Sequence, residues 1–434
     1  MQLHPPREET IAGIALAIRD GRRTCVDVLA ACLAQIDAWE SKVQAWVSID
    51  REGALSRARE LDGELTAGNW RGVLHGIPLG IKDLIDVKGW PTAAGAPWLT
   101  TAVANHDAPL VERLRAAGAI ILGKTVTTQF ACFDPPPTRN PWNLERTPGG
   151  SSSGSAAAVA TGMCLGAIGS QTGGSITRPA SFCGIAGCKP SFGLGPLQGV
   201  YPLSASLDHP GPLARSVDDL AILLGAIVDP ADRHRFAAIP KLNSVRLGRL
   251  RGMFAERADP QALAVFEQTL DHFSRAGAHV IDVALPAAFD DVLRSHRVIM
   301  TSELAEHHRS SIATRAADYL PGIRSLIEEG LRVDKAEYAR CQVQQQALKR
   351  EIAATFVDVD VIACPAALGA APTTETTGDP SFNAPWSYTG LPTVSFPIAL
   401  SADGLPLAIQ LVGRMDDETT LFAIAAWCEQ QVSR

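Results

Sequence analysis

The sequence lacks any hydrophobic run of the length needed to cross a membrane. No stretch reaches about 18 uninterrupted apolar residues, which a membrane-spanning helix requires. The first residues, MQLHPPREET, also lack the basic segment followed by an apolar segment that marks a secretory signal. We therefore expect a soluble, cytoplasmic protein with no membrane partner.

Charge is scarce, and the charged residues form no basic cluster. Only 20% of the residues are charged, the formal net charge is −7, and no long run of lysine and arginine occurs. This composition argues against nucleic acid or an anionic membrane surface as the main partner. With 434 residues, 46% of them hydrophobic, the chain is long enough to bury a large core.

The cysteines lack a metal-binding pattern. The nine cysteines are odd in number and scattered, mostly among apolar neighbours, so we expect buried free thiols in a reducing compartment. Two of them lie close together, but no second Cys/His pair lies nearby in the sequence, so we expect neither zinc nor another metal or cofactor. The cysteines are Cys25, Cys32, Cys132, Cys164, Cys183, Cys188, Cys341, Cys364 and Cys428.

What the sequence has in abundance is glycine, serine and alanine over residues 147–190. Such a composition suits loops that bring the backbone close to a substrate. The pattern predicts a helix over 155–161 with serines 151–153 at its N-cap, a strand over 163–168, and a second loop over 169–175. A helix and the strand after it run in opposite directions, so Ser151 and Ser175 should meet at one end of the unit.

A second feature is a predicted strand over residues 74–87 that is buried on both faces, with Lys82 placed at its end. One interpretation is an ion pair with Asp83 or Asp86, because a lysine in an apolar strand is usually paired. The other is that burial removes its charge, since desolvation lowers a lysine pKa and a neutral lysine is a base. The presence of both serine loops favours the base.

The same residues allow competing serine mechanisms. Residues 150–154 formally fit GxSxG with Ser152 as the nucleophile, but that elbow needs a strand immediately before it, and residues 145–148 read ERTP. A histidine-dependent triad needs a suitably placed histidine, and among the ten present only His209 beside Asp208 is a tempting candidate. Both alternatives are weaker than the lysine mechanism.

Four motifs resemble the amidase signature family. They are GIPLGIKD at 76–83, GGSSSG at 149–154, QTGGS at 171–175 and PASFCGIAGCKP at 179–190. The resemblance covers nearly the whole chain and implies an α/β fold, specifically an α/β/α sandwich around a twisted mixed central β-sheet. It also implies a Ser-cisSer-Lys mechanism, in which Ser175 is the nucleophile and Ser151 relays protons to Lys82.

The resemblance implies a defined geometry for these residues. In the family the bridging serine follows a cis peptide bond, so we expect a cis Gly150–Ser151 bond. We also expect Ser151 Oγ within hydrogen-bond reach of both Lys82 Nζ and Ser175 Oγ. The backbone N–H groups of the second loop should form the oxyanion hole. These are the N–H groups of Thr172, Gly173, Gly174 and Ser175.

Because the resemblance covers nearly the whole chain, it implies a single amidase domain over residues 1–434. N-terminal helices fill about 1–65, and the amidase core covers about 66–230. A polar and more helical segment follows over about 240–355, and core strands with a helix close the chain over about 356–434. The segment 240–355 resembles the family least, so we expect it to shape access of the substrate.

Two loops are candidates for the substrate pocket. The loop 124–146 is either a pocket wall or a rigid surface turn, and the aromatic residues 382–388 either set the substrate's shape or simply pack. Residues 135–137 and 382–388 are uncharged, so we expect a small or medium, largely neutral amide. The candidate substrate-binding residues are Gln129, which stands where many relatives carry an acidic residue, and Phe130, Gly149, Gly150, Phe382, Trp386 and Tyr388.

The expected function is hydrolysis of a carboxamide to a carboxylate and ammonia or amine, through an acyl-enzyme. The alternatives are the amidase subunit of a glutamine-dependent tRNA amidotransferase and a hydrolase of a urea-type amide such as allophanate or carboxybiuret. Against the subunit, Gln171 and Thr177 replace the Asp and Arg of the commoner DxGGSxR pattern, and Arg178 lies one place later. The retained catalytic set argues against a silent relative. The expected partner is a small amide, with a homodimer left open.

Overall fold

The computed structural model describes residues 9–236, 242 and 244–433. Within these residues, one mixed sheet has 11 strands in the order β1-β3-β2-β4-β6-β5-β10-β11-β9-β7-β8. The α/β prediction is confirmed, and the division into a single domain stays a prediction. The strands are β1 (Trp46–Ile49), β2 (Pro78–Lys82), β3 (Ile120–Thr125), β4 (Gly166–Gln171), β5 (Ala186–Lys189), β6 (His209–Ala214), β7 (Arg246–Leu250), β8 (His279–Val283), β9 (Val361–Pro365), β10 (Thr393–Leu400) and β11 (Pro406–Val412).

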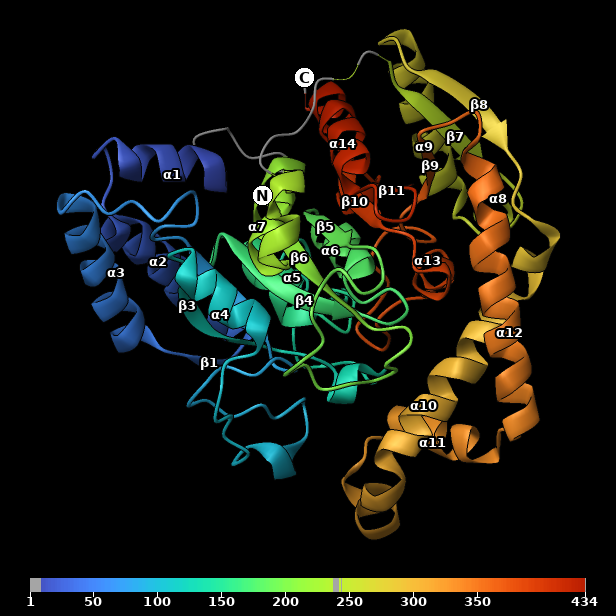
Figure 1. Cartoon of the computed structure of the whole chain (residues 1–434), viewed down its shortest axis with the longest axis horizontal. Coiled ribbons are helices and arrows are strands. Elements are labelled where there is room, and N and C mark those ends of the chain that lie inside the picture. Colours follow the sequence, from blue (N-terminus) through green and yellow to red (C-terminus); the bar gives the residue numbers. More distant parts are fainter. Residues whose placement is uncertain (1–8, 237–241, 243, 434) are drawn as a thin grey trace.

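The helices flank this sheet, with the N-terminal helices on one side of the molecule and a group of long helices on the other (Figure 1). They are α1 (Ile11–Arg19), α2 (Cys25–Val43), α3 (Arg51–Thr66), α4 (Pro109–Ala116), α5 (Ser153–Ala160), α6 (Thr177–Cys183), α7 (Val217–Ile227), α8 (Met253–Glu256), α9 (Pro260–Arg275), α10 (Val292–Arg315), α11 (Pro321–Arg332), α12 (Lys335–Glu351), α13 (Ala384–Thr389) and α14 (Glu418–Val432).

The pairing of strands decides where the serine loops lie. β3, β2 and β4 run parallel to one another, while β4 pairs with β6 in the antiparallel sense. Parallel neighbours bring their carboxyl ends to one edge of the sheet, which is where α/β proteins place their sites. β2 ends at Lys82 and β4 ends at Gln171, so the predicted lysine and the second serine loop come from the same edge.

β4 shows that helices cover both faces of the sheet. A Cβ on Gly166 would lie 2.6 Å from Leu223 of α7, and a Cβ on Gly169 would lie 2.7 Å from Ser152 Oγ at the start of α5. Side chains three positions apart on a strand point to opposite faces. Helices α7 and α5 therefore cover different faces, α6 packs beside α5, and α14 packs beside α7.

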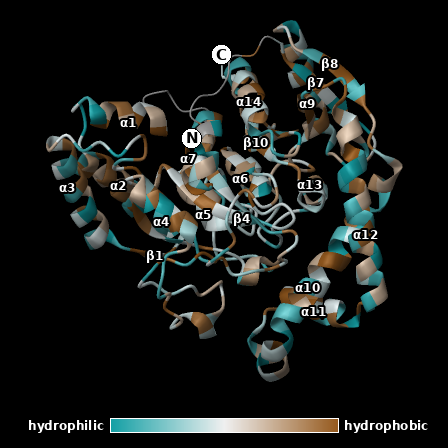
Figure 2. Cartoon of the chain, viewed as in Figure 1, coloured by the Kyte–Doolittle hydropathy of each residue, from teal (hydrophilic) through white to brown (hydrophobic). Residues whose placement is uncertain are grey.

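Several helices begin where the sequence predicts. Thr24 caps α2 through a capping box with Asp27, and Ser216 caps α7 by accepting a hydrogen bond from Asp219 N. The amphipathic pattern is also present in the outer helices, because α3 buries Ala54, Ala58 and Leu61 along one face. Figure 2 shows the resulting alternation of hydrophobic and hydrophilic residues along α3 and α12.

Two strands differ from the prediction. β4 begins at Gly166 and ends at Gln171, three residues later than the predicted strand over 163–168, so residues 169–171 belong to the sheet and not to the loop. Both faces of β4 are closely packed, so its residues are small. The strand therefore lacks the large apolar side chains by which a buried strand is recognised in a sequence. β1, which pairs with β3 in the antiparallel sense, was not predicted at all, because it has only four residues.

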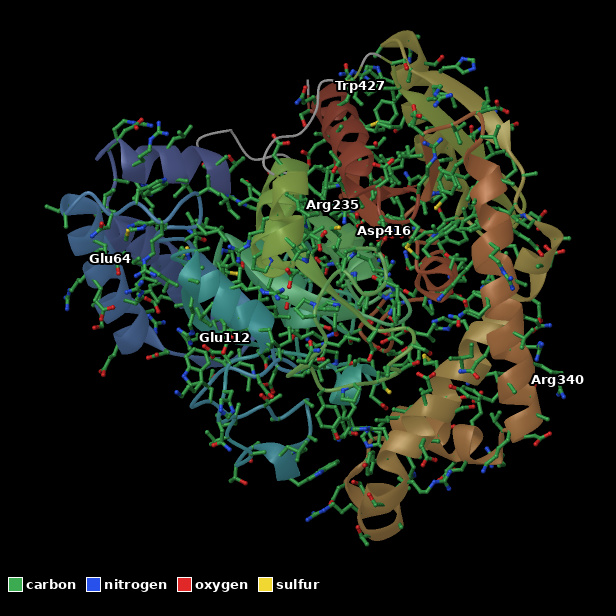
Figure 3. The ribbon with its side chains drawn as sticks, viewed as in Figure 1. Glu64, Glu112, Arg235, Arg340, Asp416 and Trp427 are labelled. Carbon is green, nitrogen blue, oxygen red and sulfur yellow. The ribbon has the colours of Figure 1, made fainter. Side chains whose placement is uncertain are left out.

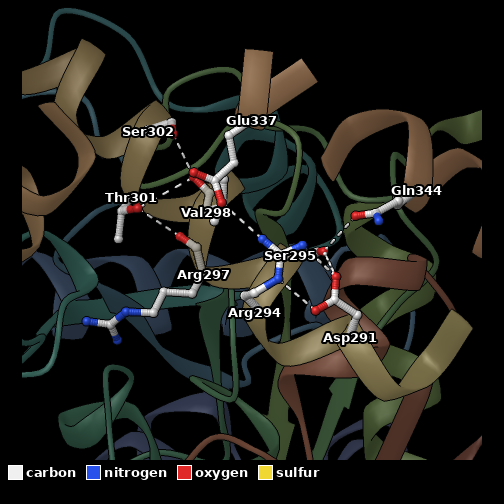
Figure 4. A network of polar contacts seen from close by, with 9 residues as sticks. All are labelled: Asp291, Arg294, Ser295, Arg297, Val298, Thr301, Ser302, Glu337 and Gln344. Carbon is white, nitrogen blue, oxygen red and sulfur yellow. Dashed lines mark hydrogen bonds and ion pairs between the residues drawn. The ribbon is translucent and has the colours of Figure 1, made fainter. Parts of the chain in front are cut away.

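Helices α10, α11 and α12 come from the segment 240–355 and pack together at one end of the molecule (Figure 1). Polar contacts join α10 to α12 (Figure 4). Arg294 of α10 donates to both carboxylate oxygens of Asp291 at 2.7 Å and to Glu337 of α12 at 3.0 Å. Ser295 Oγ donates to Gln344 of α12 at 3.1 Å. These contacts hold α10 in the position from which it reaches the candidate site.

Ion pairs tie other segments to this frame. Glu64 of α3, which is labelled in Figure 3, accepts hydrogen bonds from Arg71 and Arg57. Arg235 donates to the backbone carbonyl of Asp416 and to Glu418 at the start of α14 (Figure 3). The nine cysteines are buried and free, as predicted. Among the described residues no helix has the length and apolar character that crossing a membrane requires.

Candidate active site

Lys82 lies at the end of β2 with its amine buried among serines. Its Nζ lies 2.6 Å from Ser151 Oγ, 3.0 Å from Ser170 Oγ and 3.3 Å from the Ser170 carbonyl. The side chain is fully buried, and none of its hydrogen bonds or ion pairs among the described residues involves a carboxylate. The lysine therefore faces the first serine loop, as predicted.

The ion-pair interpretation of Lys82 is wrong. Asp83 instead pairs with Lys124 of β3, with 2.9 Å between Lys124 Nζ and Asp83 Oδ1. Asp86 accepts a hydrogen bond from Thr92 Oγ1 at 2.7 Å. Successive residues on a strand point to opposite faces, so Asp83 turns away from the face on which Lys82 lies.

Burial makes the protonated form of Lys82 much less stable than it is in water. It lowers the Lys82 pKa to about 7, and the negative charge of Asp208 opposes that shift without cancelling it. Near neutral pH a substantial fraction of the amine is uncharged. An uncharged amine beside a serine hydroxyl can accept the proton of that hydroxyl.

The two serine loops meet as the helix and strand arrangement predicts. The Gly150–Ser151 peptide bond is cis, which confirms that prediction. Ser152 N donates to the Ser175 carbonyl at 3.2 Å, so the loops are in direct backbone contact. Among the described residues, however, no hydrogen bond joins Ser151 Oγ to Ser175 Oγ, so only one of the two expected links of Ser151 is closed. Catalytic hydrogen bonds are often long until the substrate is bound.

The second serine loop leaves its backbone donors free. Within the described chain, none of the N–H groups of residues 172–175 donates a hydrogen bond to another residue. The loop itself is held from two sides: Thr172 Oγ1 donates to Asp208, and His296 Nε2 of α10 lies 2.9 Å from the Thr172 carbonyl. Fixed and unpaired donors are what an oxyanion hole requires.

Gln171 and Thr177 form a pair that supports the nucleophile loop. Gln171 Oε1 accepts hydrogen bonds from Ile176 N at 2.9 Å, Thr177 N at 3.0 Å and Thr177 Oγ1 at 3.1 Å. The amide thus satisfies donors at the start of α6, directly after Ser175. The departure from the DxGGSxR pattern is therefore a matched replacement, because Gln171 and Thr177 bond to each other at the start of α6.

We predict that Gln171→Met lowers the free energy of unfolding by about 2–3 kcal/mol, because it leaves buried N–H groups without an acceptor. Activity should fall as well, since the start of α6 positions Ser175. Chemical denaturation of the variant and of the wild type measures the difference, with Gln346→Met on the exposed side of α12 as the control. Equal stability of Gln171→Met and the control would show that this amide supports nothing.

Arg178, in the first turn of α6, is a residue of the site that the sequence analysis did not select. It is 2% exposed, and its Nη2 donates to the Gly150 carbonyl at 2.8 Å. Its Nε and Nη1 have no partner among the described residues. Burial lowers the Arg178 pKa to about 10, so the guanidinium stays charged at neutral pH.

A small pocket lies in front of Ser175. Helix α10 contributes Met300 to it, and the expectation that the segment 240–355 shapes access of the substrate stays a prediction. Loop 124–146 contributes to the wall as well, which favours the pocket interpretation of that loop over a plain surface turn. The lining residues are Ala131, Cys132, Phe133, Thr172, Gly173, Gly174, Ser175, Arg178, Leu203 and Met300.

The proposed substrate-binding residues Gln129, Phe130, Gly149 and Gly150 are not among the residues that line this pocket. Gln129 is buried and bonded to the backbone before α11, through Leu320 N at 2.8 Å and the Asp318 carbonyl at 3.2 Å. Phe130 packs in an aromatic cluster with His308 at a centroid distance of 4.5 Å. Gly149, with φ +81°, and Gly150 form the turn before Ser151. Any contact of Gln129 and Phe130 with a substrate stays a prediction.

The aromatic residues of the second loop are buried in the core. Trp386 is fully buried, stacks on Phe254, and donates from Nε1 to the Phe382 carbonyl at 2.9 Å. Tyr388 is 1% exposed and donates to the Cys341 carbonyl at 3.1 Å. None of Phe382, Trp386 and Tyr388 is among the residues that line the pocket in front of Ser175. Of the two interpretations of this segment, the structure supports packing.

The competing serine mechanisms lack their geometry. No strand lies immediately before Ser152, whose Oγ donates to the Ser170 carbonyl at 3.3 Å. His209 Nδ1 lies 2.6 Å from the Leu207 carbonyl, and within the described residues His209 forms no hydrogen bond with a serine. Among these residues there is also no group of three or more His, Cys, Asp or Glu side chains that could hold a metal ion.

Some residues at the site could not be found from the sequence. Ser170 contacts Lys82 from within β4, and it was assigned to a loop because the strand was placed too early. His296 and Met300 lie more than a hundred positions from the serine loops, and α10 carries no motif. The one available signal was Asp208, which stands in a recognisable loop and accepts from Thr172.

This α/β chain matches a family model for amidases and is similar to a solved amidase structure, so it is an enzyme of the class that cleaves C–N bonds. The family model described as Amidase matches residues 27–422. The chain belongs to the amidase family, as the motifs predicted.

Three comparisons describe its neighbourhood. A glutamyl-tRNA(Gln) amidotransferase subunit from Cyanothece sp. (strain PCC 7425 / ATCC 29141) is 34% identical, over 94% of this chain and 95% of that protein. A solved structure reported as a vestigial protein complex that reveals the evolutionary origins of an s-triazine catabolic enzyme matches with TM-score 0.90 and 30% identity, over 97% and 98% of the chains. The peptide amidase of Stenotrophomonas maltophilia matches with TM-score 0.85 and 28% identity, over 99% and 98%.

Proposed function

We propose that the chain hydrolyses the C–N bond of an amide through an acyl-enzyme on Ser175, with Ser151 and Lys82 as the proton relay. The observation that carries this proposal is the 2.6 Å contact between Lys82 Nζ and Ser151 Oγ, in a chain whose buried Lys82 has a pKa of about 7. A buried lysine without a carboxylate partner destabilises the fold, so its presence here points to use of its neutral form.

The geometry supports a sequence of proton transfers. Ser175 Oγ attacks the amide carbon, while its proton passes to Ser151 and the proton of Ser151 passes to Lys82. The N–H groups of residues 172–175 are free to bind the oxygen that becomes negative. The leaving nitrogen then takes a proton back along the same path, and water repeats the sequence on the acyl-enzyme to release the carboxylate.

A second candidate is that this chemistry serves a larger assembly. Curated relatives that are 34–35% identical to this chain are glutamyl-tRNA(Gln) amidotransferase subunits, and they support this alternative better than a free hydrolase. The replacement of Asp and Arg by Gln171 and Thr177 no longer argues against it, because the pair supports the loop by its own hydrogen bonds. The urea-type alternative draws support from the structural relative connected with s-triazine catabolism. A homodimer stays a prediction.

Ammonia release from aliphatic, aryl, amino-acid and urea-type amides tests the proposal, with the chain purified alone and with the proteins that co-purify from its native cells. We expect release that depends on Ser175 in at least one of these preparations. Release by the chain alone identifies a free amidase, and release only with co-purified proteins and tRNA identifies a component of an assembly. Absence of release in every preparation, together with absence of labelling by a fluorophosphonate, would contradict the proposed function.

A further inference from the structure

We propose that Arg178 binds a carboxylate of the substrate, so that the chain acts on short amides that carry an acid group near the amide to be cleaved. The inference rests on the proposed function, since it places the acid beside Ser175. It replaces the expectation of a neutral amide, which considered only residues 135–137 and 382–388.

The guanidinium of Arg178 has unused hydrogen-bond donors in a buried place. Nη2 donates to the Gly150 carbonyl at 2.8 Å and reaches Thr377 Oγ1 at 3.5 Å. Nε and Nη1, which together carry three hydrogens, have no partner among the described residues. Buried polar groups are nearly always paired in folded proteins, so donors left over at a site call for a ligand.

The charge of Arg178 is also unmatched. Within the described residues no carboxylate forms an ion pair with it; Asp379, whose charge raises the Arg178 pKa, pairs instead with Arg257 at 3.0 Å. Asp379 Oδ1 also accepts from Ser381 N at 2.7 Å. A buried cation without an anion is strongly unfavourable, whereas an anion bound there would gain from the same low dielectric. The missing partner is therefore an anion that the described residues do not supply.

The position of Arg178 makes a substrate carboxylate the fitting anion. Arg178 and Ser175 line the same small pocket. Arg178 N donates to the Gly174 carbonyl, and this hydrogen bond closes a helical turn that contains Ser175. Residues three apart on such a turn have Cβ atoms about 5–6 Å apart. A Cβ on Gly174 would lie 3.1 Å from Arg178 Nη1. A carboxylate at Arg178 and a carbonyl at Ser175 thus belong to one short molecule.

Arg178 has a competing structural explanation, because its bond to the Gly150 carbonyl supports the turn before Ser151. A second buried polar atom near Gly174, Asn383 Oδ1, also has no partner among the described residues, and it would lie 2.6 Å from a Cβ placed on Gly174. The two explanations differ in what they predict. A purely structural arginine affects the cleavage of all amides alike, whereas a carboxylate-binding arginine affects acid amides selectively.

The first test compares matched amides. The wild type should hydrolyse the monoamides of malonic, succinic or glutaric acid, or glutamine, with a higher kcat/KM than propionamide, butyramide or pentanamide of the same chain length. Arg178→Gln should reduce this preference by about 100-fold or more, mainly through KM. An equal loss on both series, or a wild type that prefers the neutral amides, would overturn the inference.

The second test needs no turnover. Malonate, succinate or glutarate should slow the labelling of Ser175 by a fluorophosphonate in the wild type, and the uncharged alcohols propanol and butanol, which have no carboxylate for Arg178 to bind, should not. Arg178→Gln should lose this protection. The matched control is Arg257→Gln, because Arg257 touches the same loop at Asp379 but is 42% exposed at its side chain. Labelling without protection by any dicarboxylate contradicts the inference and leaves the proposed function intact, whereas failure of labelling itself contradicts the proposed function.

Discussion

Replacing Ser175 by alanine should reduce kcat by about 10⁴-fold or more on every amide that the wild type hydrolyses. Ser175 follows two glycines, lines the pocket, and has free backbone donors around it. Without its Oγ no acyl-enzyme can form, while the fold should be unchanged because that hydroxyl makes no hydrogen bond within the described residues. Ammonia release, with the free energy of unfolding as a check on the fold, measures the effect.

Ser152→Ala is the matched control for Ser175→Ala. Ser152 would be the nucleophile if residues 150–154 formed an elbow, and among the described residues its Oγ bonds only to the backbone of Ser170. We expect this variant to keep activity within about tenfold of the wild type, since it loses two long hydrogen bonds to the Ser170 backbone, each worth about 1 kcal/mol. Loss of activity in Ser152→Ala with full activity in Ser175→Ala would reverse the assignment of the nucleophile.

Replacing Lys82 by alanine should reduce kcat by roughly 10²- to 10⁴-fold, the range that general acid–base catalysis covers. In the wild type, activity should rise with pH as Lys82 loses its proton, around a pKa of about 7. Protonation below that pH removes the base, so the acid limb of the profile belongs to Lys82. Lys82→Ala should have little or no acid limb. A limb of unchanged position in that variant would assign it to another group.

Lys189 supplies the control for the pH profile. It is a second fully buried lysine, and burial lowers its pKa to about 7 as well. Its Nζ donates to the Pro190 carbonyl at 3.0 Å, and no hydrogen bond among the described residues joins it to a serine. Lys189→Met should therefore keep the acid limb that Lys82→Ala loses. Asp208, whose pKa burial raises to about 6, titrates nearby and is tested in the same way with Asp208→Asn.

The sequence is informative wherever a local pattern has one physical meaning. Thr24 and Ser216 cap helices because their side chains accept hydrogen bonds from backbone groups three residues later. Lys82 is recognisable because a lysine at the end of a buried strand is rare without a purpose. The serine motifs lie on one continuous segment, so the contact between their loops follows from the direction of α5 and β4.

The sequence is uninformative where the meaning depends on distant contacts. The aromatic residues 382–388 suited a pocket and a core equally, and only the packing of Trp386 on Phe254 decides for the core. Arg178 stands between Thr177 and Pro179 with nothing in its neighbours to show that its guanidinium has no counter-ion. The approach of His296 to Thr172 joins residues 124 positions apart, which no local pattern encodes.

The central claim is that Ser175 carries the acyl group. Peptide mapping by mass spectrometry, after the wild type has reacted with a fluorophosphonate, tests it most directly. The account predicts one adduct, on Ser175, whose formation slows below pH 7 in the wild type and nearly stops in Lys82→Ala. An adduct on Ser151 or Ser152, or an adduct on Ser175 that forms at the same rate without Lys82, would contradict the account.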